Sequence, residues 1–409
     1  MKTTIIPSYL QTSQGQRADK ILRNCVHCGF CNATCPTYQV TGDELDGPRG
    51  RIYLIKQVLE GNAPSEHTQL HLDRCLTCRN CETTCPSGVH YSRLLDIGRH
   101  LVEQSVKRTW SQRVQRSALR SFFLSPLFGP TLQLGRLLRP IMPAAIKKTI
   151  PLRNDIATGT SSQAHTRKIL LVQGCVQKSL QPAIEVAATR VFGAIGIQTI
   201  NAATSACCGA LSHHLSAEEV ALQQIRHNID SWLPLLEQND IEAITMTASG
   251  CGVMIRDYPH LLADDTEYAV KAKRISEAYR DPIEIVSADG DRAIEQLKKE
   301  PKASSNKPSV AFHPPCTLQH GQKISGQVEA LLTALGYTLK PFANNHLCCG
   351  SAGTYSITQK NLSRKLLHNK ISSIEAADSD MIITANIGCQ THLQSATEKP
   401  VRHWLELLI

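Results

Sequence analysis

Eight of the sixteen cysteines fall in two runs with the same spacing, Cys-x-x-Cys-x-x-Cys-x-x-x-Cys-Pro. The runs are "CVHCGFCNATCP", which starts at Cys25, and "CLTCRNCETTCP", which starts at Cys75. Three cysteines at two-residue intervals wrap a tight loop around three irons of a cubane, and thiolates are the soft ligands that iron–sulfur clusters require. Zinc also accepts four thiolates, but two runs that each end in Cys-Pro favour [4Fe-4S] clusters.

The fourth cysteine of each run is directed away from the other three. In two-cluster ferredoxins with this spacing, the fourth cysteine ligates the other cluster. Each run is therefore incomplete without its partner, and we expect the ligands to cross between the runs. The predicted sets are Cys25, Cys28, Cys31 and Cys85 for cluster 1, and Cys75, Cys78, Cys81 and Cys35 for cluster 2.

The other eight cysteines reveal an internal repeat. In each copy a strand-like run ends at a cysteine, a Cys-Cys-Gly loop begins 32 residues later, and a second apolar run ends at another cysteine. Each copy therefore has four thiols, enough for an iron–sulfur cluster, a zinc ion or a redox thiol pair. The predicted additional sites are Cys175, Cys207, Cys208 and Cys251 in the first copy, and Cys316, Cys348, Cys349 and Cys389 in the second.

Alternating strands and helices must position these thiols. Each copy contains a strand, a helix, a strand, the Cys-Cys-Gly loop, a long helix and a strand, which predicts a parallel sheet with crossover helices. Sites in such sheets form at the carboxyl ends of the strands, where Cys175, Cys251, Cys316 and Cys389 are expected. A glycine after each cysteine pair, Gly209 or Gly350, allows the backbone to turn closely there.

The N-terminal cysteine runs are separated and followed by helical patterns. Apolar residues at helical spacing after Pro48 predict a helix that ends before Gly61, and residues 91–108 show a second amphipathic pattern. A compact hairpin ferredoxin has little room for such a helix. The expected fold is thus multidomain, α and α/β, with a helical two-cluster ferredoxin domain followed by two repeated α/β domains with parallel sheets.

Composition and charge indicate the cell compartment and the kind of partner. The 42% hydrophobic and 19% charged content is typical of a soluble globular protein, and the start of the chain lacks the apolar run of a secretory signal. We therefore expect a cytoplasmic protein, in which cysteines are metal ligands or redox groups rather than disulfides. No motif of a nucleic-acid-binding fold accompanies the positive charge, so no nucleic-acid partner is expected.

That positive charge is concentrated between Arg99 and Lys168. This stretch holds 13 Lys or Arg against Glu103 and Asp155, an excess greater than the +9 of the whole chain. Basic and apolar residues broken by prolines suit either docking on an anionic membrane or a partner, or a connector packed on its own protein. Asn154 to Thr166 is expected to be a flexible linker. The predicted domains are 1–110 (ferredoxin), 111–167 (basic connector and linker), 168–300 (first copy) and 301–409 (second copy).

The chain lacks a dinucleotide site of its own. No Gly-x-Gly-x-x-Gly follows an expected strand, and "CCGSAGTY" lacks the Lys-Ser/Thr pair of a phosphate loop. Hydride chemistry is therefore expected on a partner.

The Cys-Cys-Gly pairs resemble the cysteine-rich domains of heterodisulfide reductase-like oxidoreductases. Joined to "CVHCGFCNATCPTYQVTGDELDGPRGRIYLIKQVLEG", they resemble, over essentially the whole chain, the iron–sulfur subunits of bacterial glycolate oxidases. This resemblance implies flavin-containing, FAD-carrying partner subunits that oxidise glycolate to glyoxylate, and a quinone-level acceptor. It implies two [4Fe-4S] clusters here and a place in the cytoplasm or peripherally on the cytoplasmic face of the inner membrane.

The chain departs from the heterodisulfide reductase pattern at one point. Those relatives close each domain with Cys-x-x-Cys, whereas here Cys251 is followed by Met254 and Cys389 by His392. A five-cysteine cluster therefore cannot be carried over, although His392 is a candidate additional ligand. Two alternative functions stay open: the same role beside a lactate or anaerobic glycerol-3-phosphate dehydrogenase, or a redox-sensing or structural iron–sulfur protein.

Overall fold

The computed structural model describes residues 1–143, 147, 150–153, 164–202, 204–300 and 307–409. Contacts divide the chain into two units, residues 1–117 with 346–370 and residues 118–345 with 371–409. The loop and long helix of the second copy are thus grouped with the ferredoxin part. The four domain boundaries expected from the sequence stay a prediction, and the linker over 154–166 lies mostly outside the described residues.

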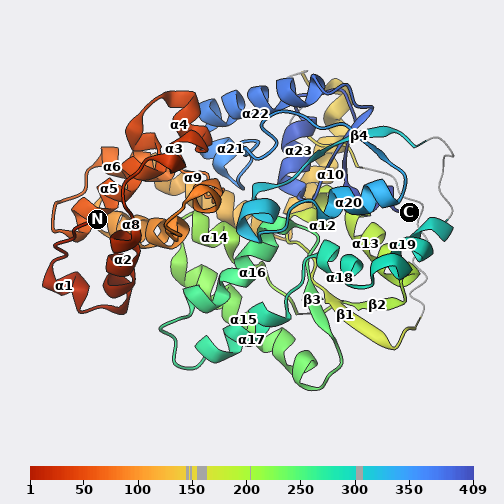
Figure 1. Cartoon of the computed structure of the whole chain (residues 1–409), viewed down its shortest axis with the longest axis horizontal. Helices are drawn as coiled ribbons and strands as arrows, with labels where there is room; N and C mark the ends of the chain where they lie inside the picture. Colours follow the sequence, from red (N-terminus) through yellow and green to blue (C-terminus); the bar gives the residue numbers. More distant parts are fainter. Residues whose placement is uncertain (144–146, 148–149, 154–163, 203, 301–306) are drawn as a thin grey trace. The chain divides into compact units, whose positions relative to one another are not determined.

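The first unit is helical, as the sequence predicted for the ferredoxin domain; its N-terminal helices are red to orange in Figure 1. The second-copy loop adds α21 (Tyr355–Thr358) and most of α22 (Lys360–Glu375). The N-terminal elements are α1 (Pro7–Leu10), α2 (Ser13–Asn24), α3 (Phe30–Ala33), α4 (Pro36–Thr41), η1 (Glu44–Asp46), α5 (Pro48–Leu59), α6 (Glu66–Asp73), α7 (Asn80–Thr84), α8 (Tyr91–Ser105) and α9 (Trp110–Leu124), which crosses the division.

The core of the first unit lies between α5 and α8. The buried face of α5 carries Ile55 and that of α8 carries Leu94 and Leu95, all fully buried. Gly98 of α8 allows a close approach, because an added Cβ would lie 2.5 Å from a side-chain carbon of Ile55. The helix expected after Pro48 is confirmed, and it ends at Leu59 before Gly61.

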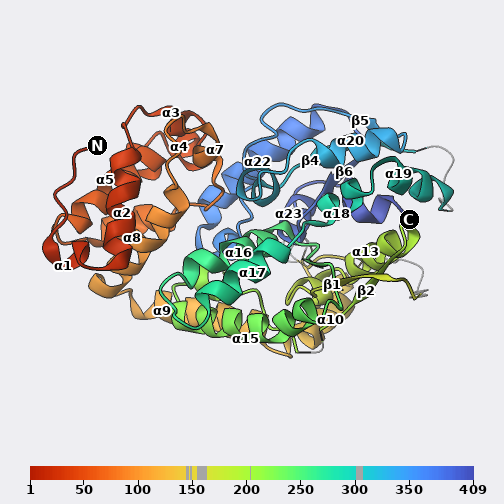
Figure 2. The same ribbon diagram turned by 60° about the horizontal axis from the view of Figure 1, so that its bottom comes forward.

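The second unit contains two parallel sheets, which confirms the sheet type expected for the repeat. The strand order is β2-β1-β3 in the first sheet and β5-β4-β6-β7 in the second. Figure 2 shows both sheets with their crossover helices. The strands are β1 (Arg167–Leu171), β2 (Ile197–Ile200), β3 (Ala243–Thr245), β4 (Ser309–His313), β5 (Thr338–Leu339), β6 (Met381–Thr384) and β7 (Val401–His403).

Helices surround and follow these strands. The first copy has α13 and α15 where the sequence predicted its two helices, and the second has α20 and α22. The remaining bounds in this unit are α10 (Phe128–Leu138), η2 (Arg139–Ile141), α12 (Gln177–Leu180), α13 (Ala183–Ala194), α14 (Ala210–His214), α15 (Glu218–Glu237), α16 (Ser249–Leu261), α17 (Ala269–Ala278), α18 (Pro282–Ala288), α19 (Gly290–Lys299), the π-helical η3 (Thr317–Gly321), α20 (Gln327–Ala334), α23 (Ile387–Gln394) and η4 (Trp404–Leu407).

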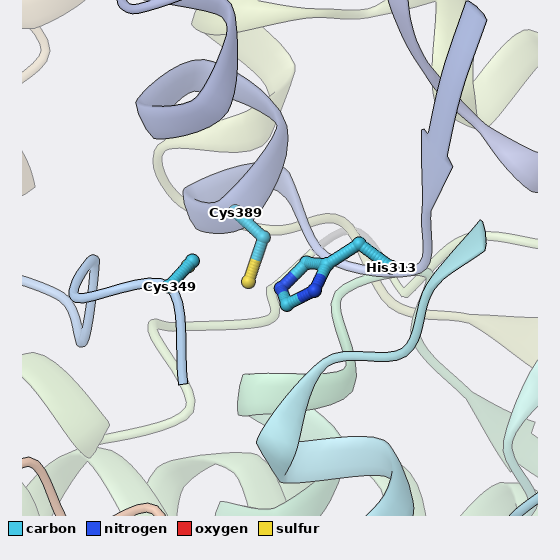
Figure 3. Close-up of side chains that lie close together, drawn as sticks. All are labelled: His313, Cys349 and Cys389. Atoms are coloured by element: carbon cyan, nitrogen blue, oxygen red, sulfur yellow. The ribbon is translucent and has the colours of Figure 1, made fainter. Parts of the chain in front are cut away.

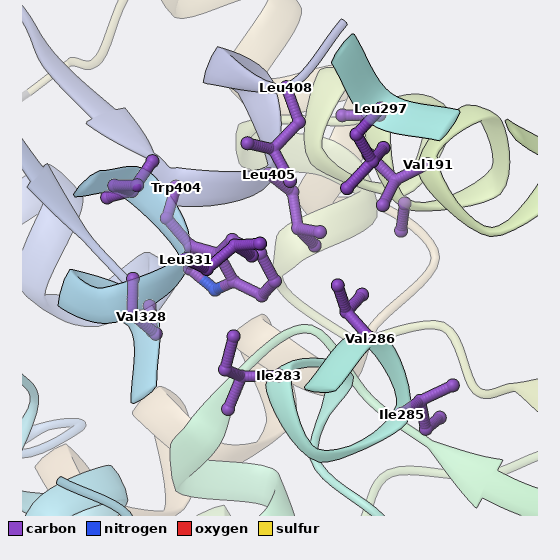
Figure 4. Packing of buried hydrophobic residues seen from close by; sticks show 14 of the residues in the cluster. Val191, Ile283, Ile285, Val286, Leu297, Val328, Leu331, Trp404, Leu405 and Leu408 are labelled. Atoms are coloured by element: carbon purple, nitrogen blue, oxygen red, sulfur yellow. The ribbon is translucent and has the colours of Figure 1, made fainter. Parts of the chain in front are cut away.

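The two copies share one hydrophobic core. Val191 of the first copy, Ile283 of the segment between the copies, and Leu331 and Trp404 of the second belong to the same buried cluster (Figure 4). Trp404 is among the largest fully buried side chains of the described residues. Because burial of such a side chain stabilises the fold by about 1.5–3 kcal/mol, this shared cluster joins the two copies, and the first copy has a second cluster of its own.

Candidate metal centres

The two N-terminal cysteine loops have the same backbone shape. His27 and Gly29 in the first loop have left-handed φ angles of 60° and 84°, and Thr77 and Arg79 at the equivalent positions have 52° and 59°. Each loop then enters a short helix, α3 or α7. Left-handed residues other than glycine are uncommon and concentrate at functional sites. The repeat seen in the sequence therefore extends to the path of the backbone around the thiols.

The residues assigned to cluster 1 come together. Cys25, Cys28, Cys31 and Cys85 line one surface pocket, which Cys81 also borders. Burial, together with the neighbouring thiols of Cys25, Cys28 and Cys85, raises the pKa of Cys31 to about 12. Thiols that raise one another's pKa in this way need a cation to hold them as thiolates. Four converging thiols fit a [4Fe-4S] cluster, and the assignment of Cys85 rather than Cys81 to it stays a prediction.

The residues assigned to cluster 2 also lie together. Burial raises the pKa of Cys81 well above its ordinary value, and the thiols of Cys78, Cys75 and Cys35 add to the shift. Tyr91 of α8 donates from its hydroxyl to the Cys75 sulfur at 3.7 Å. Hydrogen bonds to ligand sulfurs are one of the means by which a protein tunes the potential of a bound cluster.

A buried charge network adjoins cluster 2, and the sequence analysis did not identify it. Asp46 is fully buried. Its carboxylate accepts a hydrogen bond from Arg74 at 2.9 Å and is hydrogen-bonded to the His71 ring at 2.8 Å. The Arg51 guanidinium lies 3.6 Å from Asp46 and donates to the His71 carbonyl. Burial lowers the pKa of Arg51, but Cys75 and the surrounding anionic groups outweigh it and raise the pKa. A permanent positive charge therefore lies beside the thiols.

A signal for this network was present in the sequence. Arg51 sits on the apolar face of the helix, one residue before Ile52, where its position predicts burial. A buried arginine requires a carboxylate partner. The partner, Asp46, could not be identified from periodicity because it lies in a short 3-10 turn.

The four thiols of the first copy form one connected group. The sulfurs of Cys175 and Cys207 lie 3.4 Å apart. Hydrogen bonds from the Cys175 and Cys208 thiols hold the pKa of Cys207 well below its ordinary value. Hydrogen bonds to Cys207 and, as the second-largest cause, to Cys251 raise the pKa of Cys208. Four thiols in contact fit a tetrahedral metal or a small cluster.

Residues of two helices hold the Cys-Cys-Gly loop of the first copy. Asn228 of α15 donates to the Cys207 carbonyl at 3.0 Å and accepts from the Ala206 amide at 2.8 Å. Tyr258 of α16 donates to the Cys208 carbonyl at 3.1 Å. Both side chains are fully buried. The sequence analysis missed them; a polar residue on the apolar face of the helix over 218–237 was the available signal.

The thiols of the second copy fall in both units. Cys348 and Cys349 are buried in the loop that belongs to the first unit, where the Gly350 amide donates to the Cys348 sulfur at 3.4 Å. In the second unit Cys316 follows β4 and Cys389 lies in the first turn of α23. The expectation that these thiols form a site stays a prediction.

The two positions where the chain departs from Cys-x-x-Cys behave differently. Met254 is buried in the hydrophobic cluster of the first copy, where it fills space beside Gly209. His392 is partly exposed on α23, and its assignment as an additional ligand stays a prediction.

Both loop glycines are required by the backbone, as the sequence indicated. Gly209 and Gly350 have φ angles of 92° and 90°. An added Cβ at Gly350 would lie 2.8 Å from the carbonyl oxygen of Ser363 in α22. The close approach is therefore to the long helix of each copy.

Within the first unit, the second-copy loop is hydrogen-bonded beside cluster 2. Asn80, one residue before Cys81, donates to the Thr34 carbonyl at 3.0 Å and to the His346 carbonyl at 3.3 Å. Tyr355 donates to the carbonyl of Arg74 at 3.0 Å. Burial raises the pKa of Tyr355, and Cys75 and Cys348 both contribute to the shift, so this ring lies near a thiol of each group.

The basic segment combines internal ion pairs with exposed apolar side chains. Arg108 and Arg116 both pair with Asp73, at 2.6 and 3.1 Å. Leu137 and Ile141 are 75% and 81% exposed. The ion pairs fit a connector packed on its own protein, and the exposed apolar side chains fit docking on a membrane or a partner. Among the described residues, no helix combines the length and hydrophobicity needed to cross a bilayer.

Comparison with known proteins places these motifs in a family. Residues 21–89 match the 4Fe-4S dicluster domain, and residues 169–256 and 310–394 match a cysteine-rich domain called CCG. Over 409 residues, 100% of this chain and 98% of the relative, the chain is 49% identical to the glycolate oxidase iron–sulfur subunit of Escherichia coli (strain K12). It is 28% identical over 407 residues to the probable glycolate oxidase iron–sulfur subunit of Bacillus subtilis (strain 168), covering 92% and 89%.

A second group of relatives is more distant. Lactate utilization protein A of Bacillus cytotoxicus is 23% identical over 236 residues, which covers 57% of this chain and 92% of the relative. The full-length match outweighs this partial one, because it includes both CCG domains together with the dicluster domain. This chain therefore belongs to the family of glycolate oxidase iron–sulfur subunits.

Proposed function

We propose that this chain is the electron-transfer subunit of a complex that oxidises glycolate to glyoxylate. The FAD is carried by a partner subunit, and the electrons leave toward a quinone-level acceptor. One observation carries the proposal: the cluster 2 side of the ferredoxin is hydrogen-bonded, through Asn80 and Tyr355, to the CCG loop of the second copy. When bound, a [4Fe-4S] cluster takes up and releases single electrons.

The two ends of the ferredoxin differ in exposure. Around cluster 1, Cys28 is exposed, and Val26 and Phe30 are 68% and 60% exposed. Around cluster 2, Asn80 and Tyr355 are buried and bonded to neighbouring loops. This supports an order in which cluster 1 is the outer position, open to a partner, and cluster 2 the inner position, next to the CCG loop.

The substrate of the complex is proposed from the relatives. The full-length relatives are named for glycolate oxidase, whereas the lactate utilization relatives match about half of the chain. A lactate or anaerobic glycerol-3-phosphate dehydrogenase complex remains the alternative within the same chemical class. A redox-sensing or structural protein is the alternative outside it.

Anaerobic purification and electron paramagnetic resonance test the proposal. The chain is purified with its bound proteins, its flavin, iron and sulfide are measured, and spectra are recorded after glycolate, lactate or glycerol 3-phosphate is added. Reduction of [4Fe-4S] signals by glycolate in a flavin-containing sample is the expected result. If only lactate or glycerol 3-phosphate reduces the clusters, the partner is the dehydrogenase for that substrate. If the clusters are present but no flavoprotein is bound, the chain has a sensor or structural role.

We also propose that the protein contacts the cytoplasmic face of the inner membrane peripherally. Exposed Leu137 and Ile141 beside Arg139 combine the apolar and basic groups that bind anionic lipid surfaces. Co-sedimentation with vesicles of anionic and of neutral lipid is the test. Binding to anionic vesicles should fall several-fold in a Leu137→Ser, Ile141→Ser variant, and equal binding to both lipids would contradict the proposal.

A further inference from the structure

A histidine lies beside a cysteine in the second unit. His313 is the last residue of β4 and is fully buried, and Cys389 lies in the first turn of α23. A ring nitrogen of His313 and the Cys389 sulfur are within 4.8 Å of each other. Figure 3 shows the imidazole of His313 beside the thiol of Cys389. Two ligands of one tetrahedral zinc are about 3.5 Å apart, so a small movement closes this pair on a metal.

The Cys389 side chain is held in a defined position. The sulfur accepts a hydrogen bond from the side-chain amide of Asn386 at 3.7 Å. Cys389 is also the third residue of α23, so the first turn of this helix fixes its backbone. Asn386 in turn accepts from the Gly250 amide at 3.3 Å, which fixes its orientation. Metal-binding thiolates are commonly held by outer hydrogen bonds of this kind.

The first copy lacks this histidine. When "KILLVQGC" and "SVAFHPPC" are aligned on Cys175 and Cys316, Val172 takes the place of His313. The residue beside each of them on the neighbouring strand also changes from apolar to polar. Thr384 pairs with His313 in the second copy, and Met246 takes the place of Thr384 in the first. All four side chains are buried. The sheet end is therefore apolar in the first copy and polar in the second, although the thiols recur in both.

We propose that His313 and Cys389 are ligands of a mononuclear zinc-type site in the second copy, whereas the first copy keeps an all-thiol site. A borderline-soft divalent cation accepts mixed imidazole and thiolate ligands in a tetrahedral shell. Cys316, which follows β4 in the same unit, is the candidate for a further ligand position. The two copies, alike in their cysteines, thus differ in the metal that they hold.

Metal analysis of the full-length chain tests this inference. Zinc and iron per chain are measured in the native protein, in His313→Val and in His368→Ala, and zinc affinity is measured by competition with a chelator. His313→Val is a matched change because the first copy folds with valine at this position, and His368 is an exposed histidine of α22. Affinity for one zinc should fall at least about tenfold in His313→Val and stay unchanged in His368→Ala. Equal affinities in His313→Val and the native protein would overturn the inference.

A second measurement requires no variant. X-ray absorption at the zinc edge of the native protein should show a mixed shell, with nitrogen at about 2.0 Å and sulfur at about 2.3 Å. A shell of sulfur alone, or a native protein with no zinc, would overturn the inference. Neither readout depends on glycolate oxidation, so failure here leaves the proposed electron-transfer function standing.

Discussion

The sulfurs of Cys175 and Cys207 lie 3.4 Å apart, although 32 residues of sequence separate them. The strand–helix–strand unit between them brings the end of β1 and the Cys-Cys-Gly loop to the same edge of the sheet. Cys207 receives hydrogen bonds from two thiols, and its pKa is held well below the ordinary value. The fold of the first copy thus brings thiols that are distant in sequence into one connected group.

Cys207→Ser should remove the metal of the first copy. Serine keeps the size of the side chain but lacks the soft thiolate, so we expect the affinity for that metal to fall at least about tenfold. Iron, zinc and sulfide analysis after gel filtration measures the loss. Cys389→Ser is the matched control, since it should spare the metal of the first copy. A Cys207→Ser protein with the native metal content would show that the four thiols hold no metal.

Cys35→Ser should disturb the cluster held by Cys75, Cys78 and Cys81, which lie 40 to 46 residues away in the sequence. Cys85→Ser should affect the cluster held by Cys25, Cys28 and Cys31 instead. Electron paramagnetic resonance of the reduced variants separates the two signals. If each substitution affected the cluster nearer to it in sequence, the crossed assignment would be wrong.

Arg51→Met should destabilise the first unit by about 3 kcal/mol, because it leaves Asp46 buried with one cation fewer. Arg49→Met is the control, since its partner Glu44 is partly exposed and such pairs contribute under about 1 kcal/mol. Urea unfolding followed by circular dichroism gives both values. An equal loss of unfolding free energy in the two variants would mean that the buried Asp46 network contributes no more to stability than an exposed ion pair.

Gly350→Ala should destabilise the protein more than Gly353→Ala does. Both glycines have left-handed φ angles, 90° and 60°, so both changes cost about 1–2 kcal/mol in backbone strain. At Gly350 the new Cβ also meets the Ser363 carbonyl at 2.8 Å, whereas at Gly353 no atom lies within 4 Å. The overpacking adds about 1–3 kcal/mol. The difference in unfolding free energy between the variants measures it, and no difference would count against the close approach.

Asp281→Asn should flatten the pH dependence of stability between about pH 4 and pH 7. Burial raises the pKa of Asp281 to about 7, against about 3.9 in an unfolded chain. The folded state therefore binds the proton more tightly, and this stabilisation is complete below about pH 4 and is lost as pH rises through 7. Unfolding at pH 5 and pH 8 is the measurement, with exposed Asp291→Asn as control. An unchanged difference between the two pH values in Asp281→Asn would contradict the assignment.

Local patterns in the sequence predicted most of what they could physically determine. The helix from Pro48, the parallel sheets and the positive φ of Gly209 follow from periodicity, alternation and a residue without a side chain. The grouping of Cys85 with the first run rests on the spacing that cluster chemistry requires, and it stays a prediction.

Long-range packing set the limit of prediction. The ion pair of Arg51 with Asp46, and the core shared through Trp404, join segments whose contact leaves no periodic trace. His313 was overlooked because a histidine at the end of an apolar strand reads as an ordinary core residue until Cys389 is placed beside it.

The hydrogen bond between Asn386 and the Gly250 amide has a consequence for biosynthesis. The segment that leads into Cys251 depends on two residues that are synthesised much later. Asn386 follows its partner Gly250 by 136 residues, and His403, which bonds to the Thr247 carbonyl, follows Thr247 by 156 residues. A nascent chain carrying all four thiols of the first copy still lacks these partners. Metal insertion into that copy is therefore expected to follow translation rather than accompany it.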